Sequence, residues 1–199
     1  MEKTAVEELK DFAKRTGRTF HYDETPLKTG PLVNVTYNYR NLYIPNDKRE
    51  TSFYISRSNP QNYGYYANYS GVFIPVDLPT AVTCSIRKKD ILDKINPFFR
   101  PPLKTGVQYF DAKTVIEGKG ATEIRKFLKG SAVQELILKV LDVRETFRIV
   151  VNELDLGFVP GLKEQSALGI VQPKEWVLEH SAIEKMFELA EQIKIKMYS

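Results

Sequence analysis

A histidine and two carboxylates lie close together near the N-terminus, at His21, Asp23 and Glu24 in the run FHYDET. A histidine beside carboxylates could serve as general acid–base machinery. Polar residues directly before Pro26 are also typical of a solvated loop, where they carry no chemistry. The sequence favours the loop, and the acid–base cluster remains as an alternative.

Asp111 is the sharpest single candidate, because it follows Phe110 inside VQYFDAKTVI, a run that otherwise alternates like a strand. A carboxylate on a strand costs stability unless it is exposed or hydrogen-bonded. We expect Asp111 to accept backbone or threonine hydrogen bonds near a turn at Gly106. The alternative is that it lines a site. An enzyme that used Asp111 together with residues 21–24 would need the two segments to meet.

The remaining residues with reactive side chains do not favour a catalytic role. Cys84 lies on the apolar run AVTCSI and is expected to be a small buried residue rather than a nucleophile. His180 precedes Ser181, which is predicted to cap a helix. One cysteine and two histidines cannot form a standard structural zinc site or an internal disulfide. The run GKGATE at Gly118–Glu123 departs from the Walker phosphate-binding pattern, because Lys119 is followed by Gly120 and not by Ser or Thr. We expect no metal and no cofactor.

Tyrosines gather in the segment NYGYYANY. Aromatic rings at this density are typical of loops that face a protein or a ligand, since a ring gives contact area at low entropic cost. Stacking of single-stranded bases is a second alternative, but the segment lacks the leading cation of an RNA-recognition signature. The third interpretation, simple packing of the loop, is the one that the sequence favours. The candidate binding residues are Tyr63, Tyr65, Tyr66 and Tyr69.

Two basic clusters, Arg87–Lys89 and Arg125–Lys126, could dock on nucleic acid or an anionic membrane surface. The formal net charge is only +4, too small by itself to argue for either partner. The sequence therefore gives no strong nucleic-acid signal, and a protein is retained as the candidate partner.

Helix caps and hydrophobic periodicity predict the elements that must position these residues. Capping boxes begin at Thr4, Ser131 and Ser181. The predicted helices cover residues 5–16, 88–96, 121–129, 132–141 and 181–197. The predicted strands lie within residues 33–39, 51–57, 71–76, 81–86, 107–116 and 146–151, the last forming a hairpin with 154–158.

These elements predict an α+β fold, mainly antiparallel, with an N-terminal helix, a central helix pair and a long C-terminal helix. Residues 1–199 form a single domain, or two packed halves, 1–96 and 97–199. The five letters PLKTG occur at both 26–30 and 102–106. We predict that each copy is a turn into the first strand of its half and that neither is an active site. A degenerate internal duplication is the alternative.

The second half also resembles a module of uncharacterised prokaryotic proteins. The matching pattern is Gly106, Phe110, Asp111 and Val115, followed by paired helices, a hairpin and a closing helix, and it covers roughly residues 100–195. The resemblance implies an α+β domain without implying an activity. In similar proteins the module often follows membrane helices, whereas no stretch of this chain has the ~18 apolar residues that a membrane helix needs.

The sequence favours a non-catalytic binding or scaffolding protein. We expect it to be soluble and cytoplasmic, or at the cytoplasmic face of a membrane if it belongs to a longer chain. The alternatives are an enzyme that uses His21, Asp23, Glu24 and Asp111, and a protein that docks through its basic clusters.

Overall fold

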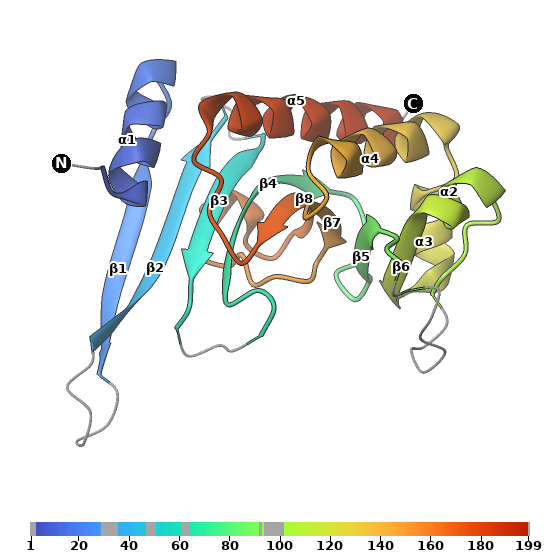
Figure 1. The fold of residues 1–199 in the computed structure, drawn as a ribbon, viewed down its shortest axis with the longest axis horizontal. Helices are drawn as coiled ribbons and strands as arrows, with labels where there is room; N and C mark the ends of the chain where they lie inside the picture. Colours follow the sequence, from blue (N-terminus) through green and yellow to red (C-terminus); the bar gives the residue numbers. More distant parts are fainter. Residues whose placement is uncertain are drawn as a thin grey trace.

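The computed structural model describes residues 3–28, 36–46, 51–60, 64–91, 93 and 102–198. Within them the chain forms one eight-stranded antiparallel sheet with helices along one face (Figure 1). The strands are β1 (His21–Lys28), β2 (Thr36–Pro45), β3 (Phe53–Ser58), β4 (Asn68–Val76), β5 (Thr83–Lys88), β6 (Thr114–Lys119), β7 (Arg148–Val151) and β8 (Ser166–Pro173). The helices are α1 (Ala5–Thr16), α2 (Gln108–Lys113), α3 (Ala121–Phe127), α4 (Ser131–Val143) and α5 (His180–Met197), with a 3-10 turn η2 (Pro160–Leu162). The α+β class and the helices at both ends agree with the prediction.

The sheet mixes strands from both halves of the chain. Its order is β1-β2-β3-β4-β8-β7-β5-β6, so β8 lies between β4 and β7, and β5 lies between β7 and β6. All neighbours are antiparallel. The edge strands are β1 and β6.

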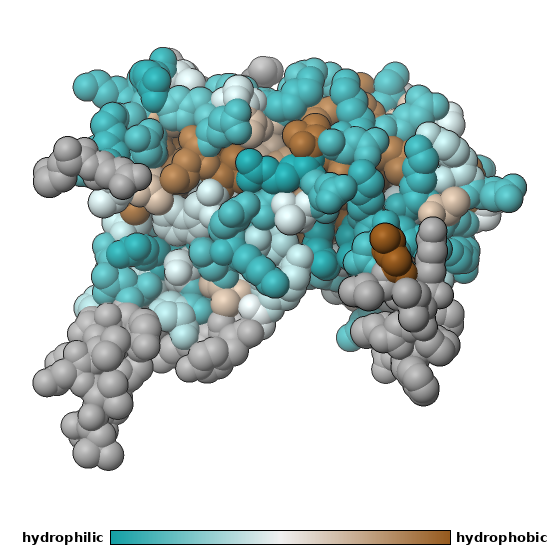
Figure 2. Space-filling view, in the orientation of Figure 1, coloured by the Kyte–Doolittle hydropathy of each residue, from teal (hydrophilic) through white to brown (hydrophobic). Residues whose placement is uncertain are grey.

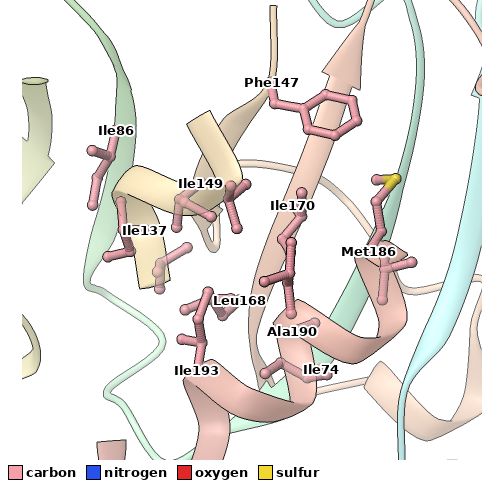
Figure 3. Packing of buried hydrophobic residues seen from close by; sticks show 14 of the residues in the cluster. Ile74, Ile86, Ile137, Phe147, Ile149, Leu168, Ile170, Met186, Ala190 and Ile193 are labelled. Carbon is pink, nitrogen blue, oxygen red and sulfur yellow. The ribbon is translucent and has the colours of Figure 1, made fainter. Parts of the chain in front are cut away.

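The larger core lies between the sheet and the helices. It combines alternate residues of the strands with the apolar faces of α1, α4 and α5, as the side chains of Ile149, Leu168, Ile170, Met186 and Ile193 illustrate (Figure 3). The space-filling view is mainly hydrophilic, and its apolar side chains lie chiefly near the helices (Figure 2). Within the described residues, no helix is long and apolar enough to cross a membrane.

A second core lies on the opposite face of the sheet, where the connection between β7 and β8 takes the place of helices. Leu156, Val159 and Leu162 of this connection pack against Phe53 of β3 and Phe73 of β4. As a result, every residue of β8 is buried. A strand buried on both faces has no reason to alternate in polarity.

Helix caps were predicted correctly at one of three sites. Thr4 caps α1 through the expected box with Glu7, and α1 ends at a left-handed Gly17. The prediction at Ser131 is wrong because Gly130 is the N-cap and the Gln134 side chain donates to the Leu128 carbonyl instead. The Ser181 box is also wrong. The N-cap of α5 is Glu179, so His180 is the first helical residue.

Several predicted strands and turns also need correction. The run 107–116 is not one strand, because α2 occupies Gln108–Lys113 and β6 begins at Thr114. The predicted hairpin between β7 and residues 154–158 is wrong, since β7 pairs with β5 and β8. Residues 21–24 were predicted as a loop but lie in edge strand β1, whose polar residues and Pro26 are compatible with an edge.

The two copies of PLKTG have different structures. Residues 26–28 of the first copy lie inside β1, and the rest of that copy lies outside the described residues. The second copy precedes helix α2 rather than a strand. The prediction of matching strand-entry turns is therefore wrong, and the structure gives no support for a duplication. Gly106 does have the positive φ expected of a turn glycine, at 89°.

We predict that Gly71→Ala will lower the free energy of unfolding by about 2 kcal/mol or more. The added methyl group would lie 2.4 Å from the Ile170 carbonyl oxygen, in the backbone of the paired strand β8. Urea unfolding measures the effect. The control is Gly130→Ala, where the nearest atom to the new methyl is 3.7 Å away, so the loss should be limited to the weaker N-cap of α4, about 1 kcal/mol or less. Equal losses in the two variants would contradict the close approach of β4 and β8.

Candidate functional site

The best-formed candidate site lies on the face of the sheet opposite the helices. Strand register places Arg57 of β3 directly beside Tyr69 of β4. The turn before β4 and the start of the β7–β8 connection complete a cavity of about 310 Å³. We name this the tyrosine–arginine site and define it by Arg57, Tyr65, Tyr66, Tyr69, Glu153 and Asp155.

Arg57 is the only cation among the residues that define the site, and its side chain is only 15% exposed. Its Nη1 donates to the backbone oxygen of Asp155 at 2.7 Å and approaches the Asp155 Oδ2 atom at 3.4 Å. Its Nη2 donates to the Tyr39 hydroxyl. The guanidinium also lies over the rings of Tyr39 and Phe158. The Asp155 side chain is 76% exposed, so a largely buried cation is neutralised by a solvated and poorly aligned carboxylate.

Three polar atoms of the site are shielded from water and form no hydrogen bond of normal geometry. They are Arg57 Nε, Tyr66 OH and Tyr69 OH. Burial raises the pKa of both tyrosines, and the positive charge of Arg57 opposes the rise for Tyr69. A buried polar group without a partner costs about 1–3 kcal/mol. These groups can supply hydrogen bonds to a bound molecule at no further desolvation cost.

The tyrosines form one continuous aromatic row. Tyr65 contacts Tyr66 edge-on at 5.3 Å between centroids, Tyr66 contacts Tyr69 at 6.4 Å, and Tyr69 contacts Phe73 at 6.3 Å. Arg148 and Lys174 both lie against the ring of Tyr65, which is the exposed end of the row. The row therefore runs from a cationic rim to the second core.

The structure brings together three of the four predicted binding tyrosines. Tyr65, Tyr66 and Tyr69 line the same cavity, whereas Tyr63 lies outside the described residues. Tyr69 is part of β4 and only 2% exposed, so it belongs to the wall of the site rather than to a surface loop.

The candidate catalytic residues are not brought together. His21 stacks on Tyr43 at 4.3 Å, and Glu24 bonds to Tyr22 and Arg40, all on the edge hairpin of β1 and β2. Asp23 is exposed on the same edge strand. Asp111 lies on α2, which contacts β6 at the opposite edge of the sheet (Figure 1), roughly 30 Å away at about 4.8 Å per strand. This separation excludes a joint acid–base site.

Asp111 has the structural contacts expected from the sequence. Its carboxylate accepts hydrogen bonds from the Thr105 amide and hydroxyl, both at 2.9 Å, and from the Gly106 amide at 3.1 Å. It therefore closes the loop before α2, although it lies on a helix rather than on the predicted strand.

The other reactive residues also have packing partners. Cys84 is buried in the larger core, and burial raises its thiol pKa to about 12, as expected for an inert thiol. The predicted capping context of His180 is wrong. Its ring instead packs on Phe12 and contacts Arg15 at 3.1 Å, which ties α5 to α1.

The basic clusters are partly neutralised within the fold. Arg87 pairs with Asp93, and Lys88 pairs with Asp142. Arg125 donates to the Lys104 carbonyl. These contacts weaken the case for a docking surface at Arg87–Lys89.

Sequence patterns did not identify Arg57, Glu153 or Asp155. Arg57 carried one usable signal, since it follows Phe53 and Ile55 at two-residue spacing and is therefore a cation on an apolar strand face. The contribution of Glu153 and Asp155 depends on the path of the β7–β8 connection, which local sequence does not specify.

Comparison with known proteins identifies a fold and no family. No protein-family profile and no curated protein matches the chain. The solved structure of the mycobacterial trehalose monomycolate transport factor TtfA is similar, with a TM-score of 0.54 over 98% of this chain and 96% of that one. The two sequences are 12% identical, so the likeness shows a shared fold.

We predict opposite effects from removing two buried tyrosine hydroxyls. The Tyr54 hydroxyl donates to the Val177 carbonyl at 2.6 Å and accepts from Ser56, whereas the Tyr69 hydroxyl lies near Arg57 without a hydrogen bond of normal geometry. Tyr54→Phe should lower the free energy of unfolding by about 1–2 kcal/mol, and Tyr69→Phe should leave it unchanged or raise it. Urea unfolding of both variants measures the difference. A loss at Tyr69 as large as that at Tyr54 would show that its hydroxyl is satisfied.

We also predict that Glu153→Gln will stabilise the protein at pH 7. Partial burial, together with the nearby charge of Glu117, raises the pKa of Glu153 above its ordinary value. A raised pKa means that folding favours the protonated carboxyl, so the ionised form opposes folding at neutral pH. The gain should disappear below about pH 4, where Glu153 is protonated in both states. Urea unfolding at the two pH values measures it.

The control for this prediction is Glu135→Gln, which changes an exposed carboxylate on α4. It should have little effect at either pH. If the free energy of unfolding gained in Glu153→Gln stays constant from pH 7 to pH 4, the charge of the carboxyl is not the cause of the gain.

Proposed function

We propose that this protein is a non-catalytic accessory protein that recognises another molecule at the tyrosine–arginine site. The observation that carries the proposal is the set of shielded, unsatisfied polar atoms on Arg57, Tyr66 and Tyr69, three residues that line one cavity. Groups of this kind reduce stability in isolation and gain hydrogen bonds when a suitable molecule binds.

The composition of the site supports recognition rather than chemistry. Its aromatic row offers contact area with few rotatable bonds, and the cation at its rim can orient a bound molecule. The candidate acid–base residues lie at opposite edges of the sheet. Within the proposal, the enzyme alternative is therefore the less favoured one.

The similar structure suggests a biological setting for this binding. TtfA is described as a transport factor. We extend to this chain the role of a transport-associated accessory protein with a protein partner, in a prokaryotic cell and at or near the cytoplasmic face of a membrane. The resemblance of residues 100–195 to an uncharacterised prokaryotic module is compatible with this setting and stays a prediction.

Site-specific photo-crosslinking tests the proposal. A benzophenone amino acid replaces Tyr65 in one variant and Tyr109 in a matched control. Both tyrosines are exposed, and each has a cation 4.1 Å from its ring, but Tyr109 lies on α2 at the far edge of the sheet. We expect a discrete crosslinked product in cells from position 65 and none from position 109.

A second substitution links the product to the site. Arg57→Lys keeps the charge but loses the planar donor group, so it should abolish the product at position 65. Equal products from positions 65 and 109, or a product that survives Arg57→Lys, would contradict recognition at this site.

A further inference from the structure

A second cavity adjoins the tyrosine–arginine site. It has a volume of about 270 Å³, and it shares with the first cavity the three residues Glu153, Leu154 and Asp155. The two cavities lie along the same face of β4, because Tyr69 lines one and Phe73 lines the other. The segment 153–155 is therefore a short strap between two hollows.

The two hollows differ in chemistry. The tyrosine–arginine site is lined by an arginine and three tyrosines, and the hydroxyls of Tyr66 and Tyr69 are shielded behind its surface. The second cavity has polar residues along its rim, but buried apolar side chains of the second core line it as well. These apolar residues are Phe73, Val150, Leu156, Leu162 and Ala167.

The strap is firmly held on both sides, and between them the Asp155 carboxylate is weakly held. On one side the Asn152 side chain bonds to the Val82 carbonyl, the Ala167 amide and the Ser166 hydroxyl. On the other side Leu156 and Val159 are buried. Between them, Arg57 Nη1 donates to the Asp155 backbone oxygen at 2.7 Å, whereas the Asp155 carboxylate reaches Arg57 only at 3.4–3.5 Å and is mostly in water. A charge-assisted hydrogen bond of good geometry is about 2.7–2.9 Å long.

We propose that the two cavities join into one binding site for a medium-chain fatty acid, whose carboxylate replaces that of Asp155 on Arg57. The acyl chain then lies over Phe73 and Val150, and the hydroxyls of Tyr66 and Tyr69 complete the contacts to the carboxylate. The strap 153–155 has to move, and this movement breaks the hydrogen bond from Arg57 Nη1 to the Asp155 backbone oxygen. This inference rests on the proposed function and names the ligand class of the same site.

The geometry explains why the ligand is both anionic and apolar. The unsatisfied atoms of Arg57 and the tyrosines are donors, so they match an acceptor such as a carboxylate. An Arg–carboxylate pair gains most when it is bidentate and shielded from water, and Asp155 achieves neither. An apolar chain in the second cavity would also cover the strand surface beneath the strap.

Direct titration with sodium octanoate, decanoate and dodecanoate tests the proposal. Trp176 is the single tryptophan of the chain, and its indole nitrogen donates to the Arg57 carbonyl at 3.2 Å, but its ring packs against the larger core on the other face of the sheet, so its fluorescence is a secondary readout. Calorimetry supplies an independent readout. We expect saturable binding that tightens about fourfold for each added CH₂ until the cavity is filled. Decanol should bind at least about tenfold more weakly than decanoate.

Variants separate the internal carboxylate from the rest of the site. Asp155→Asn removes the competitor for Arg57 and should tighten decanoate binding several-fold. Arg57→Lys and Tyr69→Phe should weaken it. The matched control is Asp142→Asn, which removes another exposed carboxylate paired with a cation, on α4, and should leave binding unchanged.

Three results would overturn the proposal. They are decanol binding as tightly as decanoate, unchanged or weaker decanoate binding in Asp155→Asn, and no saturable binding in either the parent protein or Asp155→Asn. A crosslinked product at position 65 without decanoate binding would reject the fatty acid and keep the proposed function. Absence of both would reject the two together.

Discussion

The pairing of β4 with β8 joins parts of the chain that are about a hundred residues apart, and both cores depend on it. Eight residue pairs form this ladder, from Tyr69 opposite Pro173 to Val76 opposite Ser166. Glycines at 71 and 169 allow close contact across it, with the Ile170 backbone and the Phe73 ring respectively. The connection from β7 to β8 packs over β3 and β4, against Phe53 and Phe73. The tyrosine–arginine site exists only because of that path.

The β7–β8 connection is much longer than the about two to five residues that join antiparallel neighbours most often. Its extra length supplies a second core in place of a helical layer. Left-handed backbone at Asn152 and Glu164, with φ of 51° and 62°, marks its two ends. A covering made of a loop is thinner than one made of helices, and the two cavities beneath segment 153–155 are a consequence.

The sequence predicted the elements whose signals are local. Four helices were found from periodicity, and Thr4 from its capping box. Strand β8 was missed because SALGIVQP is buried on both faces and has no alternation. Strand β1 was missed because an exposed edge strand containing Pro26 resembles a loop. The tyrosines stood out as a cluster, but Arg57 and Asp155 meet only through strand register and a long connection. Local patterns specify neither.

The energetics of Arg57 distinguish a stabilising role from a recognition role. Burying a charged side chain is expensive, and replacing a buried ion pair with apolar residues is often neutral or stabilising. Phe53 and Ile55 precede Arg57 on the same strand face and bury apolar side chains in the second core. An apolar residue at 57 would extend that core and leave no unsatisfied Nε. Arg57 recovers part of this cost through its bonds to the Asp155 backbone oxygen and the Tyr39 hydroxyl, but its Nε stays unsatisfied. Stability is therefore a weak reason for an arginine at this position, and recognition at the cavity beside it, as proposed, is a stronger one.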